Sequence, residues 1–332
     1  MHYWLVRLVA GALGAIGGAA GAQSLVVVNQ GDASISIVDP DTAKVVGRIE
    51  ERLPGKVHGH EVAVSPDGRT AYVPVYGDSG VGKPGIDGRS LLFVDLPSRA
   101  VTGTLDFGRG LRPHLPVVDP RSGLVYVTTE LDRSVTIVDP ATRQVVGRVP
   151  TGAAQSHMLA LSHDGRFGYT ANVSPGSVSV LDLKARKTLA VIPVAATVQR
   201  IAVSADDRLV FTSDADQPRL AVIDANTRAL RQWVALPSPG YGAAATRDGR
   251  WLLIALPRAD QIGVIDLRTM AVVRTIAVGK APQAVLIRPN GRMAYVSCAG
   301  DGTVAAIDLA TWTLATTIVT ASGADGLAWA AK

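Results

Sequence analysis

The chain has 332 residues, of which 47% are hydrophobic and only 18% charged, so a largely disordered chain is excluded and a large apolar core is expected. The formal net charge of +5 is spread along the chain without a dense basic run, so nucleic acid is not an expected partner. The single cysteine, Cys298, excludes both an internal disulfide and the Cys-x-x-Cys-His motif that attaches c-type haem covalently.

The first 22 residues have the features of a secretory signal peptide. Arg7 precedes a short apolar run rich in small residues, and residues 20–22 match a small-x-small cleavage site. The run is shorter and richer in glycine than a membrane anchor. We therefore expect cleavage after Ala22, export to the periplasm or out of the cell, and no membrane span in the mature chain, residues 23–332.

A repeating unit begins at about Leu25 and continues to Trp329. In each unit, two or three aliphatic residues are followed by an Asp and a short turn, and successive Asp residues are 56, 44, 43, 42, 42 and 42 positions apart. A period in the low forties with several short strands per unit is typical of a β-propeller blade. We therefore predict an all-β, seven-bladed propeller with four strands in each blade. Each Asp is expected to close the turn that follows it, and the seven are Asp39, Asp95, Asp139, Asp182, Asp224, Asp266 and Asp308.

The blade at residues 60–105 shows the expected strand pattern. Its short apolar segments at 61–65, 71–75, 91–94 and 100–104 are separated by turns that contain Pro, Gly and Asp.

The two ends of the repeat region are complementary. The region opens with an expected second strand, 25–28, and stops after a lone first strand, 326–329. One strand from each end closes a ring without leaving an unpaired sheet edge. We therefore expect the C-terminal strand to complete the N-terminal blade.

Each repeat carries one polar or ionisable residue five positions before its first turn, at the start of its innermost strand. Propeller symmetry places these side chains in one ring around the channel mouth, where few packing contacts are expected. Three adjacent repeats supply imidazoles that suit a transition metal, a non-covalent haem, acid–base chemistry on an anionic substrate, or a hydrated vestibule without a ligand. No His-Glu-x-x-His motif supports a metal at His60, His114 and His157. The ring consists of His60, His114, His157, Gln199, Tyr241, Gln283 and Asp325.

Other features lie beside this ring. Glu61, Arg112 and Arg200 flank it and are suited to orient a carboxylate or an imidazole, although Arg112 is equally compatible with a solvated loop. An insertion at 77–88 belongs to the His60 face by strand alternation, as a lid, a binding loop or a tolerated surface insertion. Its Gly-Val-Gly-Lys sequence lacks the rest of a phosphate loop, so nucleotide binding is excluded. Cys298 is better explained as a buried inert thiol than as a nucleophile.

Three segments resemble the YVTN family of β-propeller repeat proteins. They are Ser-Pro-Asp-Gly-Arg-Thr-Ala-Tyr-Val at 65–73, Val-Tyr-Val-Thr-Thr at 125–129 and Ala-Tyr-Val-Ser-Cys at 294–298. The resemblance covers nearly the whole mature chain and implies a seven-bladed propeller, commonly exported from bacteria. The repeat is also similar to surface-layer proteins, propeller lactonases and the haem-binding propeller domains of cytochrome nitrite reductases, so it implies no single activity.

Two functions fit these observations. Because no complete catalytic motif is present, the leading interpretation is an exported, monomeric binding or scaffold module that holds a small ligand or a partner protein at the histidine-bearing face. The alternative is an exported enzyme that uses His60, His114 and His157 with a transition metal or non-covalent haem, in redox chemistry ahead of lactone hydrolysis.

Overall fold

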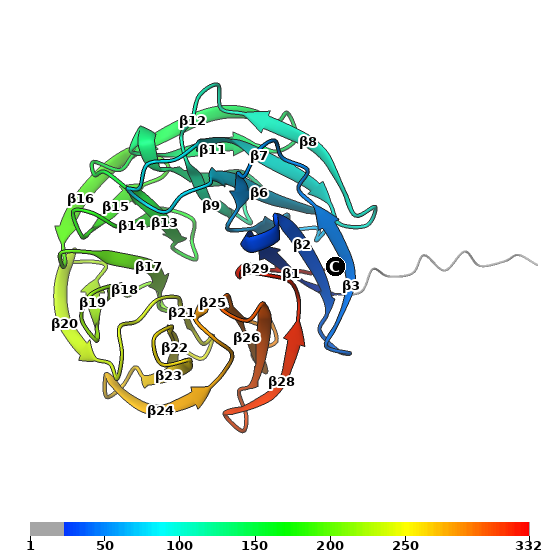
Figure 1. The fold of residues 1–332 in the computed structure, drawn as a ribbon. Coiled ribbons are helices and arrows are strands. Elements are labelled where there is room, and N and C mark those ends of the chain that lie inside the picture. Colours follow the sequence, from blue (N-terminus) through cyan, green and yellow to red (C-terminus); the bar gives the residue numbers. More distant parts are fainter. Residues whose placement is uncertain (1–22, 332) are drawn as a thin grey trace, which may run out of the picture.

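Seven antiparallel sheets surround a common axis in residues 23–331, the part of the chain that this computed structural model describes (Figure 1). Each sheet runs from the channel to the rim through four consecutive strand positions, so the predicted all-β, seven-bladed propeller is confirmed. The predicted signal peptide, residues 1–22, lies outside the described residues.

In six blades the strands follow chain order from the channel outward, and the first blade takes its innermost strand from the C-terminus. The first blade contains β29 (Ala324–Ala330), β1 (Ser24–Asn29), β2 (Ser34–Asp39) and β3 (Lys44–Glu50). The second contains β4 (His58–Gly59), β5 (Ala63–Val64), β6 (Thr70–Gly77), β7 (Asp87–Asp95) and β8 (Ala100–Asp106). The third contains β9 (Pro113–Val118), β10 (Val125–Thr129), β11 (Ser134–Asp139) and β12 (Gln144–Pro150), and the fourth β13 (Ser156–Leu161), β14 (Phe167–Asn172), β15 (Ser177–Asp182) and β16 (Lys187–Pro193).

The remaining blades repeat this plan. The fifth contains β17 (Val198–Val203), β18 (Leu209–Asp214), β19 (Arg219–Asp224) and β20 (Ala229–Ala235), and the sixth β21 (Ala243–Ala245), β22 (Trp251–Leu256), β23 (Gln261–Asp266) and β24 (Ala271–Ala277). The seventh contains β25 (Pro282–Ile287), β26 (Met293–Cys298), β27 (Thr303–Asp308) and β28 (Thr313–Val319). Short 3-10 helices follow the second strands of the first and third blades, as η1 (Gln30–Asp32) and η2 (Glu130–Asp132).

The C-terminal strand closes the ring as predicted. β29 pairs antiparallel with β1, with Leu25 opposite Trp329 and Val27 opposite Leu327. In Figure 1, the red β29 lies beside the blue β1. Because β1 also pairs with β2 on its other side, it is an interior strand with no free edge.

The innermost strand of the second blade is interrupted at residues 60–62, although the sequence predicted a continuous strand from residue 61 to 65. Only Ala63 and Val64 are assigned to β5, while β4 ends at Gly59. The reason is a contact with the neighbouring blade, because the His60 carbonyl accepts a hydrogen bond from the Gly326 N–H of β29 at 2.9 Å. A side chain at Gly326 would meet the Glu61 backbone at 2.5 Å, so the two blades approach this closely only because position 326 is glycine.

The recurring Asp residues make the predicted turn contacts. Asp39 Oδ1 accepts a hydrogen bond from the Asp41 N–H at 2.9 Å, and Asp308 Oδ1 accepts one from Ala310 at 2.7 Å. Hydrogen bonds from the turn backbone lower the pKa of both carboxyls. Because all seven serve their turns, they do not distinguish the function of one blade. The others are Asp95, Asp139, Asp182, Asp224 and Asp266.

The core lies between adjacent blades, so the middle strands are apolar on both faces. Val26 and Ile35 of the first blade share a buried cluster with Val73 and Leu92 of the second. Burial of each such side chain contributes about 1.5–3 kcal/mol. No helix of the described residues is both long and apolar enough to span a membrane.

Candidate functional site

The three histidines predicted from repeat symmetry meet at the channel mouth. The His114 and His157 rings stack with their centroids 3.6 Å apart, and the His60 ring lies 5.3 Å from His114 in an edge-on orientation. A fourth imidazole joins them, because His58 stacks on His60 at 5.0 Å. The cluster therefore contains side chains from the second, third and fourth blades.

This cluster is buried, so the expectation that these side chains make few packing contacts is wrong. His114 is 3% exposed and His157 5%. Tyr76 fills the space among them, with its ring centroid 5.0 to 5.5 Å from those of His60, His114 and His157. Burial lowers the pKa of all three histidines, because a charged imidazolium would lose its hydration. Burial therefore disfavours the charged form of all three rings, although Glu130 acts in the opposite direction on His157.

Glu130 joins the cluster through two hydrogen bonds to one carboxylate oxygen. Tyr76 Oη donates to Glu130 Oε2 at 2.7 Å, and His157 Nδ1 lies 3.2 Å from the same oxygen. Burial raises the pKa of Glu130, but the hydrogen bonds from His157 and Tyr76 outweigh it and the pKa lies below its usual value. Burial also raises the pKa of Tyr76. Neither residue was predicted from the sequence, although each lies where a second strand reaches the histidine face.

Arg200 spans the channel from the fifth blade. Its guanidinium forms ion pairs with Glu61 of the second blade at 2.6 Å and with Asp325 of the first at 2.7 Å. The same guanidinium lies 4.9 Å from the ring centroid of Tyr241 in the sixth blade. Burial raises the pKa of Glu61 to about 7 and also raises that of Asp325, because loss of hydration outweighs the attraction of Arg200. Charged groups from three blades are thus buried together inside the channel.

Within the described part of the chain, the side chains of Gln199 and Gln283 have no hydrogen-bond partner, whereas that of His60 has one. Gln199 Oε1 is buried and has no hydrogen-bond partner among the described residues. The Gln283 side chain forms no hydrogen bond or ion pair within residues 23–331. His60 is within 2.9 Å of the Gln30 amide nitrogen, which was not predicted. The predicted ring therefore supplies a histidine cluster and an Arg200 network, which meet where His60 Nδ1 lies 3.8 Å from Asp325 Oδ2, and neither includes Gln199 or Gln283.

The insertion forms an ordered strap over the histidine face. We use the name strap for residues 78–86, which connect β6 to β7. Arg112 is 5% exposed, so its interpretation as a solvated loop charge is wrong. Its guanidinium instead anchors the strap and the start of β7 through Asp87 Oδ1, the Lys83 carbonyl at 2.7 Å, Ser79 Oγ at 3.2 Å and the Gly80 carbonyl at 3.3 Å.

A pocket of about 680 Å³ lies beside the strap, between it, η1 and the loop that enters the second blade. Its lining includes His58, Lys56, Asp32 and Asp78, together with the apolar Leu53 and Val57. His58 Nδ1 lies 3.0 Å from the Lys56 carbonyl, which can only accept, so Nδ1 carries a proton and Nε2 has no hydrogen-bond partner among residues 23–331. Histidine ligands of metals commonly have this arrangement.

The buried histidines and His58 differ in whether their ring nitrogens could bind a metal ion or a haem iron. Among residues 23–331, no three His, Cys, Asp or Glu side chains are grouped so that they could hold a metal ion. Stacked rings such as His114 and His157 direct their nitrogens side by side rather than toward one point. His58, by contrast, offers a free Nε2 at a pocket within the size range of small-molecule sites, about 300–1,000 Å³.

The comparisons with known proteins agree with the fold. The family model described as Cytochrome D1 heme domain matches residues 120–239, a segment that includes Glu130, His157 and Arg200. No curated protein matches the chain. Over this segment the chain is similar to haem-binding propellers, whereas its resemblance to the YVTN family stays a prediction.

Three solved structures share the propeller. A Kuenenia stuttgartiensis hydrazine synthase structure has a TM-score of 0.70 and 17% identity, and covers 83% of this chain and 91% of its own. Dihydro-heme d1 dehydrogenase NirN in complex with DHE has a TM-score of 0.64 and 18% identity, and covers 92% and 74% respectively. A functionally unknown protein from Desulfotomaculum acetoxidans has a TM-score of 0.75 and 11% identity, and covers 92% and 98%. At these identities the structures establish the fold of the chain.

Proposed function

We propose that this protein is an exported binding module whose histidine face holds a planar tetrapyrrole of the haem d1 class. The observation that carries the proposal is His58, which keeps a free Nε2 beside a pocket of about 680 Å³. The family match over residues 120–239 supports the choice of ligand, and the predicted signal peptide at 1–22 supports export.

The chain's own residues have distinct parts in this binding. His58 would supply the nitrogen ligand, and its Nδ1–H bond to the Lys56 carbonyl fixes the tautomer. The Lys56 side chain lies in the same pocket and suits a macrocycle carboxylate. Arg112 keeps the strap in place as one wall. A bound haem-type group supplies an iron centre that can exchange electrons.

Titration with haemin tests the proposal. We expect a saturable absorbance change with one haemin per chain for the mature protein, loss of that change for His58→Ala, and weaker binding for Lys56→Ala. His163→Ala is the matched control, because His163 is exposed and pairs with Asp207 in a turn at the opposite end of the propeller. Equal loss in His58→Ala and His163→Ala, or no stoichiometric binding at all, would rule the proposal out.

A second candidate is an enzyme that acts on its ligand at this face, as the Tyr76–Glu130–His157 hydrogen bonds suggest. A phenol and an imidazole on one carboxylate can relay a proton. Tyr76→Phe keeps the ring and removes the proton. Retained haemin binding with loss of a redox turnover by this variant would support the enzyme, and unchanged turnover would exclude the relay.

A further inference from the structure

On the face opposite the histidines, two tryptophans meet in the groove between the sixth and seventh blades. Trp251 begins β22 and Trp312 lies in the turn before β28. Their rings are 5.4 Å apart at 68°, and both side chains are half-buried. They line a pocket of about 290 Å³ whose polar residues are Thr246, Arg247, Asp248 and Asn290.

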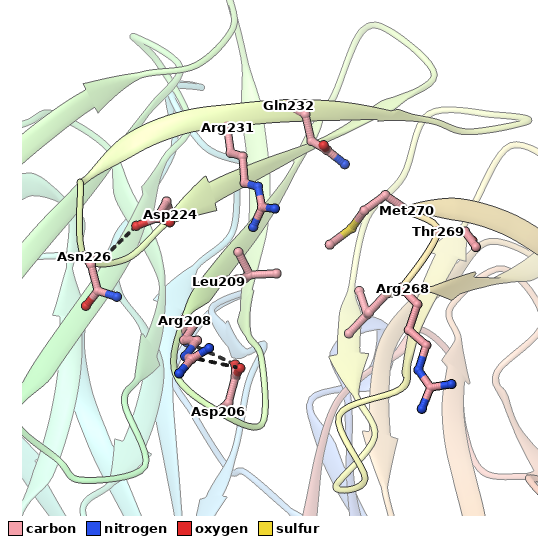
Figure 2. Close-up of a pocket in the computed structure, with 11 residues that line it drawn as sticks. Asp206, Arg208, Leu209, Asp224, Asn226, Arg231, Gln232, Arg268, Thr269 and Met270 are labelled. Carbon is pink, nitrogen blue, oxygen red and sulfur yellow. Dashed lines mark hydrogen bonds and ion pairs between the residues drawn. The ribbon is translucent and has the colours of Figure 1, made fainter.

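The neighbouring groove has aliphatic side chains at these two positions. Figure 2 shows this groove, between the fifth and sixth blades, with Leu209 and Met270 on its walls. Leu209 pairs with Asp224 as Trp251 pairs with Asp266, so the two residues are equivalent in the repeat. Met270 and Trp312 are equivalent too, because each N–H donates to an Asp carbonyl at 2.8 Å.

Packing between blades does not require aromatic residues here. The groove on the other side, between the seventh and first blades, has Met293 and Ala43 at these positions. The left-handed conformation of Trp312, with a φ of 60°, is shared by Met270 and Ala43, so the turn itself is the same in all three grooves. Trp251 and Trp312 therefore occupy two positions that have aliphatic side chains in both flanking grooves.

The polar groups of this pocket have unused hydrogen-bonding capacity. Arg247 forms no hydrogen bond or ion pair within the described part of the chain. Asp248 Oδ1 accepts from Thr246 Oγ1 and from the Arg250 N–H at 3.0 Å, which leaves Oδ2 available. Asn290 Oδ1 accepts from Arg292 N–H at 3.0 Å, which leaves its Nδ2 donors available.

We propose that this groove is a carbohydrate-binding site for one neutral pyranose ring. The Arg250 guanidinium lies 4.6 Å from the Trp251 ring centroid, so one face of that indole is already occupied. The remaining indole faces are electronegative and attract the C–H face of a sugar ring, while carboxylate, amide and guanidinium groups bond its hydroxyls. Arg247 and Asp248 balance in charge, which favours a neutral ligand over an anionic one. The volume of about 290 Å³ is at the lower end of ligand pockets and suits a single ring.

A test of this site can use the residues that the repeat has at the same two positions in the neighbouring groove. Trp251→Leu with Trp312→Met gives the groove the residues of its neighbour in Figure 2, where Leu209 and Met270 pack against the apolar core. Asn290→Asp keeps the Oδ1 acceptor for Arg292 and removes the amide donors. Asp206→Asn in the neighbouring groove is the matched control, because Asp206 is the equivalent of Asp248 in that turn.

Saturation-transfer NMR on the mature protein would use glucose, mannose, galactose and N-acetylglucosamine as probes, with adenosine and phenol as aromatic competitors. We expect one of the sugars to bind, the double tryptophan variant to lose binding at least about tenfold, Asn290→Asp to weaken it, and Asp206→Asn to leave it unchanged. Circular dichroism would verify that each variant is folded. No sugar signal in the unmodified protein, undiminished binding in the double variant, or preference for adenosine or phenol would each overturn the assignment.

Discussion

Arg200 donates a hydrogen bond of 2.7 Å to Asp325, although the two residues are 125 positions apart in the chain. One belongs to the fifth blade and the other to the strand that closes the ring. Together with Glu61, the pair connects blades that share no strand pairing. This contact across the channel therefore joins the fifth blade to the first and second.

Replacement of Arg200 by Met should destabilise the fold by about 3–5 kcal/mol at pH 8, because Glu61 and Asp325 would remain buried without a cation. Adding Glu61→Gln and Asp325→Asn should recover much of the loss. Urea unfolding measures both effects. As a control, Arg48→Ala removes exposed ion pairs with Asp32 and Glu50 and should cost less than about 1 kcal/mol. A single Arg200→Met variant as stable as the unmodified protein would show that the network contributes nothing.

Glu51 should make stability fall as the pH rises. Its side chain is buried, Oε2 accepts the Gly59 N–H at 2.9 Å, and Oε1 has no hydrogen-bond partner among residues 23–331. Burial raises the pKa of this carboxyl to about 7. The folded state therefore binds the proton more tightly than the unfolded state, and stability decreases between the unfolded value of about 4.3 and about 7.

Glu51→Gln should remove this decrease, which amounts to at most about 3 kcal/mol between pH 4 and 8. The lowered pKa values of His60, His114 and His157 act with the opposite sign below about 6.5, so the informative quantity is the difference between variant and unmodified protein. Urea unfolding at several pH values measures it. Parallel stability curves for the two proteins would contradict the prediction.

Arg112→Ala should loosen the strap while the propeller stays folded. The variant loses the bonds to Ser79, Gly80 and Lys83, so amide exchange in residues 78–86 should accelerate about tenfold, and Arg112→Lys should rescue it only in part. Hydrogen–deuterium exchange with mass spectrometry measures this. Arg89→Ala, which removes an exposed pair with Asp106, is the control. Unchanged protection of the strap in Arg112→Ala would mean that other contacts hold it.

Deletion of residues 326–332 should reduce solubility, because β1 would then present an unpaired edge to other chains. Size-exclusion chromatography and thermal unfolding measure the result. If the truncated protein were as monomeric and as heat-stable as the mature chain, the pairing of β29 with β1 would not be needed to protect this edge.

The fold could be predicted because its information is local and repeated. Each blade carries the same strand lengths, turn residues and Asp, so errors in one unit are corrected by the others, and the ring closure follows from counting strands. Symmetry also brought His60, His114 and His157 together correctly, because equivalent positions of adjacent blades must be close.

The features that the sequence did not reveal lie where the chain departs from its repeat. The surroundings of the histidines depend on Tyr76 and on Glu130 in a 3-10 helix, and neither has a counterpart in every blade. No role was predicted for His58 from the sequence, since its importance comes from a backbone contact to Lys56 that no spacing rule predicts. Loop conformation, unlike strand register, is not transferable between repeats.

The dual attachment of β29 has a consequence for biogenesis. This strand pairs with β1, its Gly326 bonds the His60 carbonyl, and its Asp325 receives Arg200. During synthesis from the N-terminus, all three partners are made before β29 and stay without it until it follows. A nascent or truncated chain would therefore lack a finished histidine face as well as a closed ring, so a ligand that recognises this face would discriminate complete molecules from incomplete ones.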